Sequence, residues 1–143
     1  MKRPVGVTVV AVIAIIYGIF ELLLTLLALL GLALLASGLG NLAARAHASG
    51  LTTGNLTYAL ISDGVLGILY LAFGIGAFQL KSWAWTTGVV AVGLDVVRTL
   101  VGVVIHGFSA SNIVGPIITI VIALVALWYL FRPNVRAAFG KAA

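Results

Sequence analysis

Three ionisable side chains, Glu21, Asp95 and Arg98, lie within long apolar stretches of the sequence. Asp95 and Arg98 are three positions apart, in the segment GLDVVRTLVG from 93 to 102. In a helix this spacing puts both side chains on one face, where they can form an ion pair. A carboxyl group without a partner in such surroundings can instead hold a movable proton, because burial disfavours its charged form. The residues therefore predict either an ion-pair cluster that fixes helix packing or a proton-binding site.

The composition of the chain places it in a membrane. Of its 143 residues, 63% are hydrophobic and only 8% are charged, and the mean hydropathy is +1.28. Such a chain has too few polar side chains to cover a surface that faces water. The apolar runs are continuous rather than alternating, which favours spanning helices of about 20 residues over an outer-membrane barrel. We expect an all-α, polytopic membrane protein with a single domain, residues 1–143, forming a bundle of four transmembrane helices at about 5–36, 58–80, 83–105 and 113–131, with an outer loop at about 37–57.

Basic residues predict the orientation of this bundle. Most of them flank helix ends on one side of the membrane, whereas Arg45 is on the other side. By the positive-inside rule both termini are then cytoplasmic, in a multi-pass protein of the cytoplasmic (inner) membrane. The same side carries the aromatic residues expected to anchor helices at the interface, and its charge would attract anionic lipid headgroups. The basic residues are Lys2, Arg3, Lys81, Arg132, Arg136 and Lys141, and the interfacial anchors are Trp83, Trp85, Trp128 and Tyr129.

Each predicted helix has one face of small and polar residues at steps of three and four, which keep them on one stripe. Lipid gives helices no hydrophobic reason to associate, so small residues that let backbones approach closely have to supply the contacts. The stripes therefore predict the packing of the bundle. They comprise Ala14, Gly18, Glu21, Thr25 and Ala28; Asp63, Gly67, Tyr70, Gly74 and Ala77; Gly88, Ala91, Asp95, Arg98 or Thr99, Gly102 and His106; and Asn112, Pro116, Thr119, Ala123 and Ala126.

The first and third predicted helices resemble each other around their acidic residues. ELLLTL, which begins at Glu21, aligns without a gap with DVVRTL, which begins at Asp95. This similarity suggests a parallel duplication of a two-helix hairpin. If the alignment holds, Glu21 and Asp95 lie at one depth near the bilayer centre.

Charges at that depth have to be paired or neutralised, since an ionised side chain there costs about 2.5 to 3.5 kcal/mol on insertion scales. Two acids share one base in this cluster. We expect Asp95 and Arg98 to pair along their own helix, because the helix geometry guarantees their proximity. Glu21 then either completes the cluster or carries a proton at neutral pH.

A second polar site is expected near the outer surface, at Asp63 and His106. Asp63 would lie in the first turn of its helix, where the helix dipole favours an acid. Together with His47 these residues come from three separate segments without ligand spacing, so no metal site is predicted. The chain has no cysteine, which excludes disulfides, thiolate metal sites and iron–sulfur clusters. We expect no cofactor.

Three segments at the predicted cytoplasmic interface carry a resemblance. They are RPVGVT from Arg3 to Thr8, KSWAW from Lys81 to Trp85, and YLFRPNVRAAFG from Tyr129 to Gly140. Together they resemble a group of small, uncharacterised four-helix membrane proteins of bacteria and archaea. The resemblance implies the four-helix fold and its topology, and it implies no activity.

The sequence contains no nucleophile–base–acid set, glycine-rich phosphate loop or nucleic-acid patch, so we expect neither an enzyme nor a nucleic-acid partner. The abundance of small-residue faces favours an accessory or scaffold subunit that associates with itself or with other membrane proteins. The helix at 58–80, with its four glycines, could pack on two sides. The alternative is a small proton-coupled transporter or channel that uses Glu21 and Asp95. In that case, Arg98 beside the acids would disfavour cationic substrates.

Overall fold

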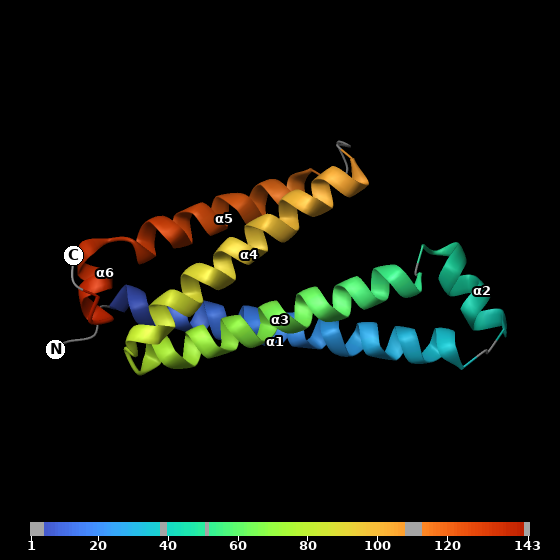
Figure 1. The fold of residues 1–143 in the computed structure, drawn as a ribbon, viewed down its shortest axis with the longest axis horizontal. Coiled ribbons are helices and arrows are strands. Elements are labelled where there is room, and N and C mark those ends of the chain that lie inside the picture. Colours follow the sequence, from blue (N-terminus) through green and yellow to red (C-terminus); the bar gives the residue numbers. More distant parts are fainter. Residues whose placement is uncertain (1–4, 38–39, 51, 108–112, 142–143) are drawn as a thin grey trace.

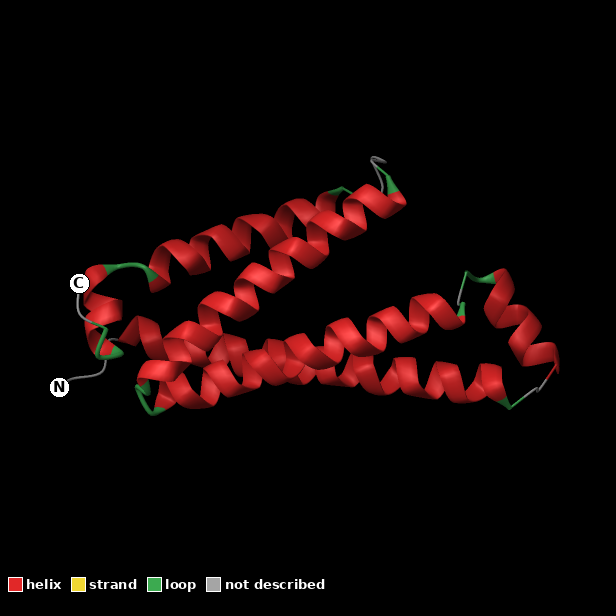
Figure 2. Cartoon of the chain, in the orientation of Figure 1, coloured by secondary structure: helices red, strands yellow, loops and turns green. Residues whose placement is uncertain are grey.

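A computed structural model describes residues 5–37, 40–50, 52–107 and 113–141 of the chain. These residues form helices and no strand (Figures 1 and 2). The all-α class expected from the sequence is therefore confirmed. The helices are α1 (Val5–Ala36), α2 (Gly40–Ala48), α3 (Thr53–Phe78), α4 (Ser82–His106), α5 (Val114–Leu130) and α6 (Pro133–Ala138).

The helix ends agree with the sequence-based ranges except around the outer loop. The expected loop at 37–57 contains α2, which comprises the whole segment GNLAARAHA, and α3 begins at Thr53 rather than at 58. Thr52 starts α3 early because its hydroxyl accepts a hydrogen bond from the backbone N–H of Asn55, at 3.2 Å, as a helix cap does. The early start lengthens α3 by more than one turn.

Three helices, α1, α3 and α4, are long and apolar enough to cross a membrane. Helix α5 is also apolar but has 17 residues, or about 26 Å at 1.5 Å per residue, somewhat less than the hydrocarbon core of a bilayer. Large apolar side chains cover the outer surfaces of these helices, among them Ile16, Leu27, Ile68 and Val104. A surface of this kind is suited to lipid, and the chain is a membrane protein.

The long helices form two antiparallel hairpins (Figure 1). Helices α1 and α3 pack along most of their lengths, and α4 packs against α5. The hairpins lie close together near the chain ends and diverge toward the far end, where α2 follows α1 (Figure 1). The structure is therefore a pair of joined hairpins that splay apart at one end.

Glycine allows the close approach of α1 and α3. A Cβ atom added to Gly18 would lie 2.9 Å from the backbone nitrogen of Leu71 and 3.0 Å from the carbonyl oxygen of Gly67. Gly74 is similarly close to the Ala11 carbonyl. The small-residue stripes predicted for these two helices are buried at the residues Ala14, Gly18, Glu21 and Ala28 and at Asp63, Gly67, Tyr70, Gly74 and Ala77.

Helix α6 closes the end of the molecule at which the hairpins meet. Val135 of α6 and Phe139, the residue that follows this helix, are buried together with Val7 of α1 and Leu130 of α5. The indole N–H of Trp85 donates a hydrogen bond to the Leu130 carbonyl at 2.8 Å, which ties α4 to the end of α5. This apolar plug seals the terminal end of the space between the hairpins.

We predict that Gly18→Ala lowers the stability of the protein in detergent by about 1 to 3 kcal/mol, because the added methyl group overpacks the α1–α3 contact. Gly93→Ala is the matched control: it lies in the interior of α4, and a Cβ there meets no atom within 4 Å. The control should be neutral or gain up to about 1 kcal/mol in helix propensity. Thermal unfolding followed by size-exclusion chromatography measures both. Equal effects of the two substitutions would contradict the packing described.

Candidate functional site

All three acidic residues of the chain meet between the hairpins. Glu21 comes from α1, Asp63 from α3 and Asp95 from α4, and their exposed fractions are 2%, 6% and 6%. Arg98, about one turn beyond Asp95 on α4, lies among them. Two tyrosines complete the group, which we call the polar layer: Tyr17, Glu21, Asp63, Tyr70, Asp95 and Arg98.

Arg98 forms ion pairs with two carboxylates on two other helices. Its Nη1 lies 2.9 Å from Oδ1 of Asp63 and 3.3 Å from Oε2 of Glu21. The two acids are almost fully buried, whereas 30% of the Arg98 side chain remains exposed. The long side chain therefore links α4 to both helices of the first hairpin.

The pair expected along α4, between Asp95 and Arg98, does not form. Among the described residues, the ion pairs of Arg98 are with Glu21 and Asp63, so Glu21 completes the cluster, which is one of the two alternatives that the sequence left open. The reason is electrostatic: across the interface the guanidinium contacts two carboxylates, whereas along its own helix it would contact one.

Asp95 is bound by tyrosine hydroxyls instead. The hydroxyl of Tyr70 donates to Oδ2 of Asp95 at 3.2 Å, and that of Tyr17 donates to the same oxygen at 3.4 Å. The two rings are in edge contact, with centroids 4.8 Å apart and planes at 85°. Hydroxyl donors stabilise a carboxylate without changing the charge of the site. Among the described residues, Asp95 thus has no cationic partner within ion-pair distance.

Asp63 belongs to this layer and not to an outer polar site. The sequence analysis put it in the first turn of its helix, but α3 begins at Thr53, so Asp63 lies nearly three turns inside the helix. Its partner is Arg98. The side chain of His106 lies outside the described residues, and among these the structure shows no group of metal-ligating side chains.

The polar layer carries an uncompensated negative charge. Three carboxylates against one guanidinium give a formal charge of minus two, since −3 + 1 = −2. Uncompensated charge is expensive at membrane depth, where each ionised group costs about 2.5 to 3.5 kcal/mol on insertion scales. The layer is therefore poised to bind protons or another cation.

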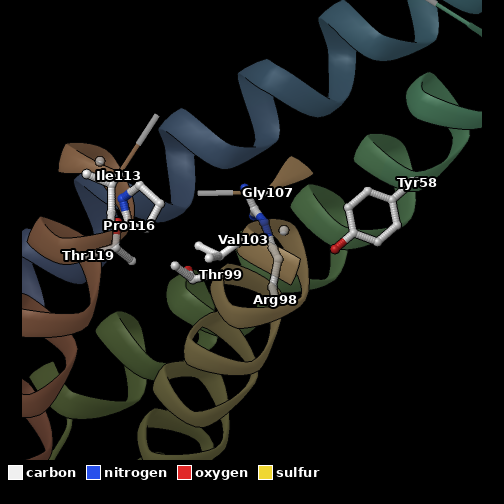
Figure 3. Close-up of a pocket in the computed structure, with 10 residues that line it drawn as sticks. Tyr58, Arg98, Thr99, Val103, Gly107, Ile113, Pro116 and Thr119 are labelled. Carbon is white, nitrogen blue, oxygen red and sulfur yellow. The ribbon is translucent and has the colours of Figure 1, made fainter. Parts of the chain in front are cut away.

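A cavity of about 450 Å³ lies on one side of the layer, and we call it the loop-side cavity. Figure 3 shows Arg98 extending along it, with Tyr58 of α3 on one flank and Pro116 and Thr119 of α5 on the other. Its lining reaches Gly107, at the end of α4, and Ile113, just before α5, and the cavity is partly open. Water or a solute can thus approach Arg98 from the far end of the hairpins.

A second cavity, of about 220 Å³, lies on the other side of the layer, and we call it the inner cavity. Asp95, Tyr17 and Tyr70 form its polar wall, and the rest is mostly apolar. Thr119 of α5 lines both cavities, so they adjoin at that residue. The two cavities therefore lie on either side of the charged groups.

The sequence alone does not indicate a role for the two tyrosines of the layer. Tyr70 lies on the predicted small-residue stripe of its helix, whereas Tyr17 is not among the residues of the first stripe. The available signal was spacing, because Tyr17 precedes Glu21 by one helical turn and so lies on the same face.

Comparisons of the chain with protein-family models, with curated protein sequences and with solved structures found no match. The account of the site therefore depends on its geometry.

We predict that Tyr17→Phe/Tyr70→Phe destabilises the protein by about 1.5 to 3 kcal/mol, because it removes both hydroxyls that stabilise the Asp95 carboxylate. Adding Asp95→Leu to this double variant should recover most of the loss, since the unsatisfied acid is then gone. Tyr58→Phe, at a half-exposed tyrosine, serves as the control. Denaturation in detergent at neutral pH measures all four proteins, and a failure of Asp95→Leu to rescue would count against the assignment.

Proposed function

We propose that the protein is a small, non-catalytic, proton-linked carrier in which the polar layer binds the coupling proton. The observation that supports this is the meeting of all three carboxylates of the chain in one layer that contains, among the described residues, a single guanidinium, so that their ionised forms leave two negative charges uncompensated. Proton binding at Asp95 or Glu21 lowers that charge, so the stability of the closed layer depends on protonation. No covalent step is needed for this role.

The cavities support a carrier more than a channel. A carrier exposes its site to one side of the membrane at a time. Here the loop-side cavity leads from the far end of the hairpins to Arg98 and adjoins the inner cavity at Thr119. Beyond the inner cavity, the buried plug around Leu130 and Phe139 closes the terminal end. The arrangement fits a state that is accessible from the loop side.

Four spanning helices with both termini in the cytoplasm fit this arrangement, and they form part of the proposal. The first residues of α1 and the last residues of α6 lie at the same end of the molecule (Figure 1). Helix α5 would span a thinned or locally adapted bilayer, with Trp128 at its interfacial end. The loop-side cavity would then face the outside of the cell.

Membrane sidedness can be tested with single cysteines, because the chain has none of its own. We predict that a membrane-impermeant maleimide labels Arg45→Cys and Thr99→Cys in right-side-out vesicles, and Lys141→Cys in inside-out vesicles. Ala84→Cys, at a fully buried position, is the control and should react only after denaturation. Labelling of Arg45→Cys and Lys141→Cys from the same side would exclude the proposed topology.

An accessory role remains the second candidate, in which the protein associates with itself or with another membrane protein. The glycines of α3 no longer support it, because Gly67 and Gly74 pack against α1 within the same chain. What favours association is α4, where a Cβ on Gly93 or Gly102 would meet no atom within 4 Å. Small residues without neighbours are suited to close helix packing in lipid.

The carrier proposal is tested by counting protons. Purified protein in weakly buffered detergent is titrated from about pH 8 to about pH 5, and proton uptake is compared with that of Asp95→Asn and Glu21→Gln. We expect each variant to take up about one proton fewer than the wild type if that acid binds it. Thr87→Ala, at a half-buried threonine outside the layer, is the control. Identical uptake by the wild type and both acid variants would refute the proposal, whatever the oligomeric state.

A further inference from the structure

The inner cavity has the chemistry of a binding site for a small organic cation. We propose that it binds a lipophilic ammonium ion, whose charge is held by Asp95 and exchanged for a proton. This inference rests on the proposed function and names the substrate class of the same site. Its basis is a nearly buried carboxylate that has no cationic partner within ion-pair distance among the described residues, on the wall of a mostly apolar cavity.

The charge of the site favours a cation. The groups that face Asp95 are the hydroxyls of Tyr17 and Tyr70, and none of the residues that line the inner cavity is basic. Arg98 lines the other cavity and contacts Glu21 and Asp63. Arg98 therefore disfavours a cation in this cavity less than its place beside Asp95 in the sequence suggests, because its guanidinium is paired with two carboxylates and does not line the cavity.

The aromatic rings and the apolar wall select an organic cation over a metal ion. Tyr17, Tyr70 and Phe73 line the cavity, and ring faces attract ammonium groups by cation–π interaction. A metal ion such as Mg²⁺ or Ca²⁺ takes six or more oxygen ligands, whereas much of the cavity lining is aliphatic and includes Ile122, Ala123 and Leu130 of α5. Apolar contact with these residues suits the organic part of an ammonium ion.

The size and position of the cavity limit the ligand further. Its volume of about 220 Å³ is below the roughly 300 to 1,000 Å³ of pockets for drug-sized molecules. Two of its lining residues, Ile13 of α1 and Ile122 of α5, are exposed on the outer surface, so the cavity borders the lipid between these helices. A small lipophilic cation can thus enter the inner cavity from the bilayer, or from the loop-side cavity past Thr119.

Binding and proton release balance in one step. The protonated Asp95 carboxyl and a quaternary ammonium ion give the ion pair and one free proton, with no covalent change in the ligand. The titratable and charged groups around this exchange are Tyr17 and Glu21 from α1, Tyr70 and Asp63 from α3, and Arg98 from α4. Helix α5 contributes Thr119, Ile122, Ala123, Ala126 and Leu130 to the cavity, none of which titrates.

Isothermal titration calorimetry on the purified chain in detergent tests the proposal. The probes are tetramethylammonium, benzyltrimethylammonium and the larger tetraphenylphosphonium, which have no titratable proton of their own. We expect the two ammonium ions to bind and, at a pH at which Asp95 holds a proton, to release about one proton each in weak buffer. Their affinity should fall as the pH is lowered, because the proton competes for the carboxylate. Tetraphenylphosphonium should bind at least about tenfold more weakly because it exceeds the cavity.

Asp95→Asn should weaken ammonium binding by at least about tenfold. If this variant fails to fold, a pair on α5 keeps the proposal testable. Ala126→Phe fills the inner cavity and should abolish binding, while Val125→Phe, at an exposed neighbour, should leave it unchanged. Ala126→Phe should keep the proton uptake of Asp95.

The outcomes separate the two proposals. Proton uptake that depends on Asp95, without ammonium binding, overturns the ammonium site and leaves the proton site standing. Ammonium binding that depends on Asp95 but releases no proton supports the ligand class and overturns the proton-linked function. Equal binding by the wild type, Asp95→Asn and Ala126→Phe overturns the proposed site altogether.

Discussion

The arrangement of the hairpins depends on one shared cation. Arg98 projects from α4, and its guanidinium contacts Glu21 and Asp63 on the other hairpin. Breaking a buried ion pair by removing one partner typically costs about 3 to 5 kcal/mol, because the remaining charge stays buried without a counter-ion. Here one arginine forms ion pairs with two carboxylates. The position of α4 relative to α1 and α3 is therefore coupled to the charge state of Glu21 and Asp63.

This sharing determines what is left for Asp95. With the guanidinium committed to the other two acids, Asp95 relies on Tyr17 and Tyr70, whose hydroxyls stabilise its charge without cancelling it. The result is a division of the layer into an outer half, in which one guanidinium contacts two carboxylates, and an inner half around Asp95, which has no cationic partner within ion-pair distance among the described residues. Each half borders its own cavity, so a proton or cation that binds at Asp95 changes the electrostatics of the whole layer.

Much of the fold follows from composition and periodicity. The apolar runs predict the long helices, and the spacing of small residues identifies the buried stripes of α1 and α3 correctly, because close packing in lipid requires glycine or alanine at fixed intervals. The position of Asp63 could not be predicted, since it depends on the cap at Thr52 that starts α3 early. The partners of Arg98 could not be predicted either. Local spacing identifies only the acid on the same helix, whereas the observed contacts are with residues far apart in the sequence.

The most direct test of this account is a set of double-mutant cycles that pair Arg98→Gln with Asp63→Asn, Glu21→Gln or Asp95→Asn, read from the free energy of unfolding in detergent. The account predicts coupling energies of about 1 to 3 kcal/mol between Arg98 and both Asp63 and Glu21, and a clearly smaller coupling between Arg98 and Asp95. If the largest coupling were instead between Arg98 and Asp95, the ion pair along α4 would be the real one and the shared cation would be contradicted.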